Sequence, residues 1–143
     1  MPKDFIRTTE STSLYNNIEK SSTLDILQNI NTEDKKVAIE VEKQIPQIQL
    51  FVDAAAEKLV NGGRLFYIGA GTSGRLGLVD ASECPPTFGV SSELVTGIIA
   101  GGQKAMFHAV ENAEDDVENG WSELLKYNIS KDDFVLGLSL IHI

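Results

Sequence analysis

The architecture of this chain follows from residues 64–75, which read Arg64-Leu65-Phe66-Tyr67-Ile68-Gly69-Ala70-Gly71-Thr72-Ser73-Gly74-Arg75. The first five residues are too few and too rich in β-forming side chains for a helix, and they lead directly into glycine. We therefore expect a buried strand over Arg64–Ile68. After the glycines we expect a helix from about Ser73 to Ser82. A strand that passes through a glycine turn into a helix is typical of an α/β domain.

The glycine turn is placed where an anion binds well. Free backbone N–H groups and the helix dipole favour negative charge at the start of a helix, and phosphate fits this position. Glycines allow the backbone to approach phosphate oxygens, and the hydroxyls of Thr72 and Ser73 can donate hydrogen bonds. Arg75 either adds positive charge or anchors the helix. The predicted phosphate-binding residues are Gly69, Gly71, Thr72, Ser73, Gly74 and Arg75.

Two other interpretations of this turn are open. Its residues also match the G-x-G-x-x-G pattern of dinucleotide-binding folds, which place an acidic residue about 20 positions later, after a second strand. Here the nearest acids, Asp80 and Glu83, come directly off the helix with no strand before them. This spacing favours a monophosphate over a dinucleotide. The remaining interpretation is a tight strand-to-helix turn without a ligand.

The residues before the strand predict a helical arm. Residues 1–20 are polar, and we expect them to be extended. Ser22-Thr23-Leu24-Asp25 resembles a capping box that opens a short helix through Leu27, and Asn31 to Asp34 resembles the start of another helix. Apolar residues then recur at helical spacing up to Gly62-Gly63. Because Pro46 interrupts this series, we expect two helical segments to meet there.

The residues after the turn continue the alternation of strands and helices. We expect a strand over Leu94–Ile99, a helix over about Gln103–Asn112, a further helical face around Trp121 and Leu124, and a strand over Asp133–Leu138. The order β-α-β-α-β predicts an α/β fold with a parallel sheet and helices on its faces. The expected domains are residues 1–45, the arm, and residues 46–143, the sugar-phosphate-binding part.

Composition narrows the class of ligand and the compartment. With 21 acidic and 12 basic residues the net charge is -9, which argues against a nucleic-acid partner. Cys84 is the only cysteine, so a reducing compartment is expected. Residues 1–10 include four charged side chains, Lys3, Asp4, Arg7 and Glu10, and no apolar stretch. We expect a cytoplasmic protein without a membrane segment. His108 and His142 are too few and too far apart to predict a metal site.

Several stretches together resemble the N-acetylmuramic acid 6-phosphate etherase family. They occur in the family's order and spacing within a resemblance that extends from about Ser22 to Gly137. The stretches are Gly69 to Arg75, Asp80-Ala81-Ser82-Glu83-Cys84-Pro85-Pro86-Thr87, Gly97-Ile98-Ile99-Ala100-Gly101-Gly102 and Ala113-Glu114-Asp115-Asp116. The resemblance implies a sugar isomerase (SIS) domain, a doubly wound sandwich around a parallel sheet, with sites near the subunit interface of a homodimer.

The resemblance also implies an activity and two catalytic carboxylates. Enzymes of this family cleave the lactyl ether of N-acetylmuramic acid 6-phosphate, which yields N-acetylglucosamine 6-phosphate and D-lactate in peptidoglycan recycling. No metal or redox cofactor is implied. The family's catalytic acid/base corresponds to Glu83, and its second active-site carboxylate corresponds to Glu114. Without the resemblance, Glu114 reads as part of a solvated acidic helix end.

Two alternatives share this fold, and the end of the chain departs from the family. The alternatives are a sugar-phosphate sensor without catalytic activity and an aldose–ketose isomerase of sugar phosphates. After Gly137 the family continues into a further ligand loop and a whole second half, whereas this chain reads Leu138-Ser139-Leu140-Ile141-His142-Ile143. We therefore expect the chain to be truncated and its own activity to be impaired.

Overall fold

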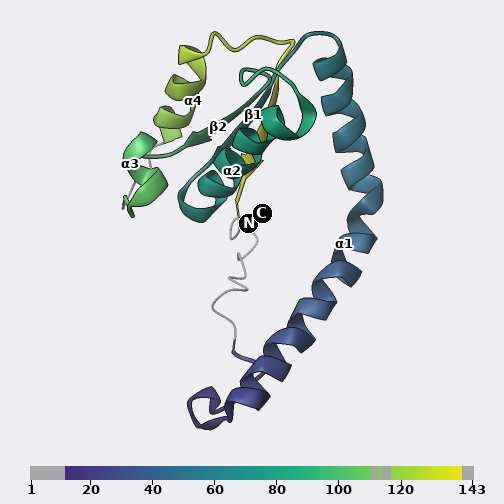
Figure 1. The fold of residues 1–143 in the computed structure, drawn as a ribbon, viewed down its shortest axis with the longest axis vertical. Helices are drawn as coiled ribbons and strands as arrows, with labels where there is room; N and C mark the ends of the chain where they lie inside the picture. The colour runs from purple at the N-terminus through teal and green to yellow at the C-terminus, as the bar shows by residue number, and fades with distance from the viewer. Residues whose placement is uncertain (1–11, 111–112, 114–116, 140–143) are drawn as a thin grey trace, which may run out of the picture. The chain divides into compact units, whose positions relative to one another are not determined.

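The computed structural model describes residues 12–110, 113 and 117–139. Three parallel strands form its sheet: β1 (Leu65–Gly69), β2 (Val95–Ile99) and β3 (Phe134–Leu138), in the order β2-β1-β3 (Figure 1). In register, Ile68 of β1 lies opposite Ile98 on one side and Gly137 on the other. The predicted α/β class and parallel sheet are confirmed, and the predicted strand with its glycine turn is the central strand.

Helices cover both faces of the sheet because side chains alternate along β1. Phe66 is completely buried against Ile98 and Leu124, and Leu124 belongs to α4 (Val117–Lys126). Tyr67 points to the opposite face, where α2 (Gly71–Phe88) packs so closely that a Cβ on Gly77 would lie 2.7 Å from the Tyr67 Cβ. The doubly wound arrangement of an SIS domain follows from this alternation.

Helix α2 is longer than the sequence predicts. It continues through Pro85 and Pro86 to Phe88, whereas we expected it to end near Ser82. A proline removes one backbone donor, but both prolines lie in the last turn, so few helical hydrogen bonds are lost. Gly89 then ends the helix in the left-handed conformation, with φ of 66°, and its N–H donates to the Pro85 carbonyl at 2.9 Å.

Helix α1 (Thr23–Val60) is a single helix of 38 residues. The predicted end at Leu27, the predicted new start at Asn31 and the predicted separate segments around Pro46 are therefore wrong. The predicted cap at Ser22 is confirmed, with the Asp25 side chain on the Ser22 hydroxyl and not on its backbone N–H. The Asp25 N–H donates to the Ser22 hydroxyl at 3.1 Å, and that hydroxyl donates to the Asp25 carboxylate at 2.6 Å. Pro46 removes one hydrogen-bond donor, and the helical bonds on either side of it are enough to continue the helix.

The chain divides into two compact units, one up to Leu50 and one from Phe51. In the first unit a short 3-10 helix, η2 (Ile18–Lys20), precedes α1, and the Tyr15 hydroxyl donates to the Glu33 carboxylate at 2.5 Å. In the second unit the Phe51 ring packs edge-on against Phe134, with ring centroids 5.1 Å apart. The predicted boundary between residues 45 and 46 remains a prediction.

The shortest α-helix of the described residues, α3 (Gly102–Phe107), follows β2 and ends before the predicted limit at Asn112. The backbone is already extended at His108, with φ of -128°. Among the described residues, no helix has both the length and the apolar character needed to cross a membrane.

Candidate functional site

The predicted phosphate loop is a very short turn at the carboxyl end of the central strand. Strand β1 ends at Gly69 and α2 begins at Gly71, with only Ala70 between them in an extended conformation. The first helical hydrogen bond runs from the Gly74 N–H to the Ala70 carbonyl at 3.2 Å. Because helix geometry gives the preceding N–H groups no intrahelical acceptor, those of Gly71, Thr72 and Ser73 form the start of an anion site.

Two of the three glycines in the loop serve the packing of the helix on the strand. A Cβ on Gly74 would lie 2.6 Å from the Gly69 carbonyl oxygen, and a Cβ on Gly69 would lie 2.9 Å from the Gly74 nitrogen. Gly71 has a different role, because its φ is +52° and a Cβ there would face open space. Backbone conformation therefore favours glycine at Gly71, and close approach requires it at Gly69 and Gly74.

The two hydroxyl side chains of the loop differ in burial. Ser73 is only 7% exposed, whereas Thr72 is exposed. Within the part of the chain that the structure describes, neither hydroxyl has a hydrogen-bond partner. No buried side-chain oxygen among the described residues lacks a partner, so the Ser73 hydroxyl is the accessible atom of an otherwise buried residue. Such a hydroxyl is held in place by its surroundings and can donate to a ligand oxygen.

Arg75 anchors α2 to the end of α3. Its Nε donates to the Met106 carbonyl at 3.1 Å, and its Nη2 donates to the His108 carbonyl at 3.3 Å. The sequence left two roles open for Arg75, a charge for the ligand or an anchor for the helix, and these hydrogen bonds correspond to the anchor. A phosphate contact would have to use the remaining donors of the guanidinium.

Two further segments meet the loop, and the sequence indicated only one of them. The Ala100 N–H donates to the Gly69 carbonyl at 2.9 Å, which ties the turn before α3 to the loop. That turn contains Gly101 and Gly102, both with positive φ. The end of β3 also reaches the loop, since a Cβ on Gly69 would lie 3.0 Å from the Leu138 carbonyl oxygen. Parallel pairing brings the carboxyl ends of the strands together. No local sequence motif predicts that the end of β3 lies beside the loop.

Glu83 lies far from the loop within one chain. It is exposed on α2, and the rise along the helix from Gly71 is about 18 Å. The resemblance assigns Glu83 to catalysis, but α2 continues away from the loop instead of turning back at the prolines. The structure therefore brings the loop residues together and leaves Glu83 apart from them. Glu114, the second predicted carboxylate, lies outside the described residues.

The neighbouring acid of the same helix has a partner. The Tyr67 hydroxyl donates to the Asp80 carboxylate at 2.7 Å. Burial of the ring and this hydrogen bond raise the pKa of Tyr67, so the phenol stays protonated at neutral pH. Asp80 and Glu83 are both exposed, but Asp80 is tied to the sheet by this hydrogen bond. Among the described residues, no three metal-ligating side chains gather into a cluster.

The sequence matches one family model and many curated proteins. The model is described as the glucokinase regulatory protein N-terminal SIS domain and matches residues 46–140. The N-acetylmuramic acid 6-phosphate etherase of Bacteroides thetaiotaomicron is 53% identical over 136 residues, which cover 95% of this chain and 49% of that protein. The corresponding protein of Christiangramia forsetii is 55% identical over 131 residues, covering 92% and 48%.

A third relative, from Clostridium beijerinckii, has the same name and is 57% identical over 123 residues, which are 86% of this chain and 40% of that protein. The chain thus spans about half the length of the curated relatives it matches. These relatives confirm the resemblance found in the sequence motifs. By its fold, its glycine turn and the family match over residues 46–140, the chain belongs to the SIS-domain family of the glucokinase regulatory protein N-terminal type.

Proposed function

We propose that this chain supplies the sugar-phosphate-binding part of an N-acetylmuramic acid 6-phosphate etherase. The single observation that supports the proposal most directly is the β1–α2 turn. There the hydroxyl of Ser73, a buried residue, has no described protein partner and lies beside the first N–H groups of a helix. The names of the relatives supply the substrate class, a phosphorylated amino sugar.

In the proposed complex the loop holds the 6-phosphate of the sugar. The N–H groups of Gly71, Thr72 and Ser73 donate to phosphate oxygens, and the Thr72 and Ser73 hydroxyls add further donors. Gly69 and Gly74 keep the helix start close to the strand end. This arrangement binds the phosphate and leaves the sugar ring to other groups.

The proposed reaction is an elimination followed by addition of water. With the sugar ring open, the C1 aldehyde acidifies the C2 proton, and a carboxylate base removes it. The bond between C3 and the ether oxygen then breaks, and that oxygen takes up a proton and departs in D-lactate. Water adds to C3 and a proton returns to C2, which gives N-acetylglucosamine 6-phosphate. We assign the proton transfers to Glu83 and Glu114, because carboxyl groups can alternate between acid and base.

The position of Glu83 supports a homodimeric enzyme. A carboxylate about 18 Å along α2 from the loop is too far away to reach C2 of a sugar whose phosphate sits in the same chain's loop. In a homodimer with sites near the subunit interface, Glu83 can act on the sugar held by the other chain. We also propose that the enzyme works in the cytoplasm, where its role is recycling of peptidoglycan amino sugars.

Product analysis tests this function. Incubation with N-acetylmuramic acid 6-phosphate should release D-lactate, and unphosphorylated N-acetylmuramic acid should react far more slowly because the loop has no phosphate to hold. The assay is run on this chain and on the chain extended to the length of its relatives. Formation of a ketose would instead identify an isomerase, and tight binding of the sugar phosphate without any product would identify a sensor.

A further inference from the structure

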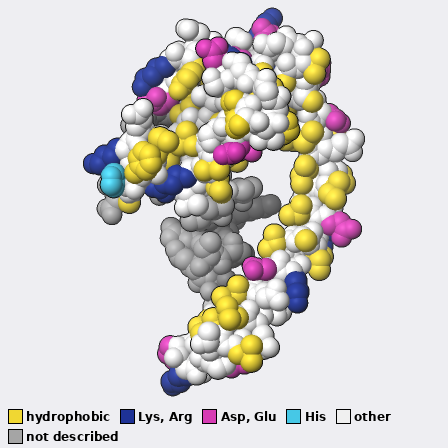
Figure 2. Space-filling model, in the orientation of Figure 1, with side chains coloured by type: hydrophobic (Ala, Val, Ile, Leu, Met, Phe, Trp, Pro, Cys, Tyr) yellow, Lys and Arg dark blue, Asp and Glu magenta, His cyan; other side chains and the backbone are white. Residues whose placement is uncertain are grey.

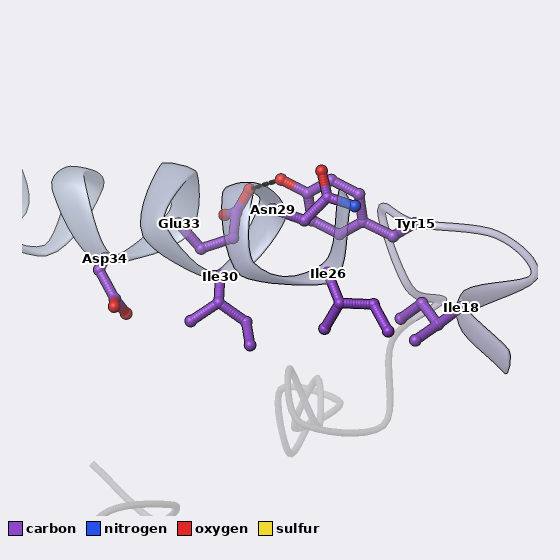
Figure 3. Close-up of a pocket in the computed structure, with 7 residues that line it drawn as sticks. All are labelled: Tyr15, Ile18, Ile26, Asn29, Ile30, Glu33 and Asp34. Carbon is purple, nitrogen blue, oxygen red and sulfur yellow. Dashed lines mark hydrogen bonds between the residues drawn. The ribbon is translucent and has the colours of Figure 1, made fainter. Parts of the chain in front are cut away.

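The first half of α1 has a stripe of side chains spaced alternately by three and four residues. This is the spacing that brings side chains to one side of a helix in a coiled coil. The stripe consists of Ile30, Asp34, Val37, Val41, Gln44 and Ile48. In Figure 3, Ile30 and Asp34 project from the same side of the helix, next to Ile26. Four of the six positions are apolar, and the two polar ones are separated by ten residues.

The stripe is exposed within its own unit. Ile30 is 53% exposed, Val37 60%, Val41 49% and Ile48 43%. Figure 2 shows apolar side chains at the surface all along this helix. Val37, Val41, Gln44 and Ile48 line an open groove of 520 Å³. A long helix gains most of its stability from packing an apolar face. We therefore expect a second helix to pack against this stripe.

The two polar positions indicate the direction of that partner. In a parallel pair, Asp34 would face Asp34 of the second copy, and two carboxylates would be buried together at a high electrostatic cost. In an antiparallel pair with its two-fold axis beside Ile39, Val37 faces Val41 of the second copy, and Ile30 faces Ile48. The same arrangement places Asp34 opposite Gln44, whose amide can donate to a carboxylate. Every layer is then apolar against apolar or acceptor against donor.

The charges beside the stripe are compatible with this pairing. Glu40 would approach Glu40 of the second copy near the axis, but the Lys43 ammonium already lies 2.6 Å from its carboxylate. Glu33 is paired in the same way with Lys36 at 2.7 Å. Pro46 follows Ile39 by seven residues, on the face opposite the stripe, so its missing donor does not enter the contact.

We propose that residues 30–48 of α1 form a docking surface for the same residues of a second copy of this chain, arranged antiparallel. The proposal specifies a contact for the homodimer proposed above. Its test measures assembly alone, so it can fail while lactate release succeeds, and the converse also holds.

The first test compares two aspartate substitutions in the full 143-residue chain by sedimentation over a range of concentrations. Val41→Asp places a charge in the stripe of both copies and should raise the dimer dissociation constant by about 100-fold or more. Ile39→Asp introduces the same residue, with the same helix propensity, at another exposed apolar position of α1. It should leave the dimer dissociation constant unchanged. Equal effects of the two substitutions, or a chain that is monomeric at every concentration, would overturn the proposal.

The second test determines the direction, and it does not depend on how well an aspartate variant folds. Cys84 is replaced by Ser, and single cysteines are introduced as Ile30→Cys in one preparation and Ile48→Cys in another. Oxidation of the mixture should give a disulfide between the two variants. Either variant alone should remain unlinked, because an antiparallel pair separates identical positions by about 27 Å. Efficient linkage of Ile30→Cys to itself would show a parallel pair and refute the arrangement.

Discussion

Gly74 is the residue on which the contact between α2 and the central strand depends most directly. A Cβ at this position would lie 2.6 Å from the Gly69 carbonyl oxygen and 2.6 Å from Cγ1 of Ile99. Since the first of these is a backbone atom, the helix start itself would have to move. We predict that Gly74→Ala lowers the free energy of unfolding by about 1–3 kcal/mol, the usual cost of overpacking.

Urea denaturation measures this loss, and Gly137→Ala is the matched control. Gly137 lies in β3, and a Cβ there would meet nothing within 4 Å. Alanine at that position should be neutral or slightly stabilising, because it reduces the freedom of the unfolded chain. A loss of similar size in both variants would mean that close approach is not what makes Gly74 necessary.

Ser73 is one of two loop residues whose hydroxyls we assign to phosphate binding, and it is the less exposed of the two. We predict that Ser73→Ala weakens binding of N-acetylmuramic acid 6-phosphate by about 1–3 kcal/mol, because it removes a donor to a charged oxygen. Binding of the unphosphorylated sugar should not change, and calorimetry can compare the two. Ser82→Ala is the control, since the Ser82 hydroxyl donates to the Val79 carbonyl on the same helix. An equal loss for both sugars would argue against phosphate contact at Ser73.

Glu83 is the described residue that we assign to proton transfer. In the enzyme of full family length, Glu83→Gln keeps the size of the side chain but removes its ability to carry a proton. We predict a fall in lactate release of about 10² to 10⁴, the usual contribution of a general acid or base. The affinity for the sugar phosphate should change little, because the loop holds the phosphate.

Solvent deuterium exchange at C2 separates the two possible roles of Glu83. Exchange should fall with lactate release if Glu83 removes the C2 proton, and it should persist if Glu83 only protonates the ether oxygen. Glu93→Gln, at an exposed position before β2, is the control and should keep full activity. Near-normal lactate release by Glu83→Gln would shift the assignment to Glu114 or to residues beyond this chain.

At the scale of the elements, the Arg64–Asp133 pair connects the start of β1, the end of α4 and the start of β3. The Arg64 guanidinium before β1 donates to its carboxylate at 2.9 and 3.0 Å, and the Ser130 N–H donates at 2.9 Å. Arg64 also donates to the Tyr127 carbonyl after α4, at 3.1 Å. The Asp133 side chain is only 3% exposed and that of Arg64 is 32% exposed, so the carboxylate is shielded from solvent and the guanidinium only in part.

The hydrogen bonds from Arg64 lower the pKa of Asp133 from its ordinary 3.8 to about 2. A lowered pKa in the folded state means that the stabilisation is fully present above about pH 4 and is lost as the pH falls toward 2. We predict that Asp133→Asn lowers the free energy of unfolding at pH 7 by about 2 kcal/mol and removes this part of its decline between pH 4 and pH 2.

Chemical denaturation at a series of pH values checks this dependence. Asp132→Asn is the matched control, because Asp132 is the neighbouring residue and is exposed. It should change the unfolding free energy by less than about 0.5 kcal/mol. If the Asp133→Asn variant kept the same acid dependence as the parent chain, the ion pair with Arg64 would not be its cause.

At the scale of the whole molecule, the question is whether the sugar-phosphate-binding part folds without the arm. A chain of residues 46–143 begins at Pro46, and proline is well tolerated in the first turn of a helix. It keeps the Phe51 ring on Phe134 and the hydrogen bond from the Lys58 ammonium to the Lys131 carbonyl. We predict cooperative unfolding with a midpoint within about 5 °C of the whole chain.

Circular dichroism during heating measures both midpoints. A chain of residues 61–143, which lacks both of these helix contacts, is the comparison and should unfold at a clearly lower temperature. Failure of the 46–143 chain to unfold cooperatively would mean that the boundary at residue 46 is misplaced.

Local sequence determined the central unit of this protein. The run of β-forming residues from Leu65 and the glycines after it gave the correct strand, turn and helix start, because chain direction at such a turn depends on steric limits within a few residues. The helix cap at Ser22 could also be predicted from the sequence, because both of its hydrogen bonds join residues that are three positions apart. The alternation of strands and helices then implied a parallel sheet, because a crossover helix constrains how successive strands pair.

Tertiary structure decided which neighbours these elements meet. The helices α1 and α2 continue past Pro46 and Pro85 because hydrogen bonding along each helix outweighs the local cost of a proline, which a residue-by-residue interpretation of the sequence underestimates. Tertiary structure placed Arg75 on the carbonyls of α3 and carried Glu83 away from the loop. Such outcomes depend on atoms brought together from distant parts of the chain, and the chemistry of Arg75 or Glu83 alone does not specify which atoms those are.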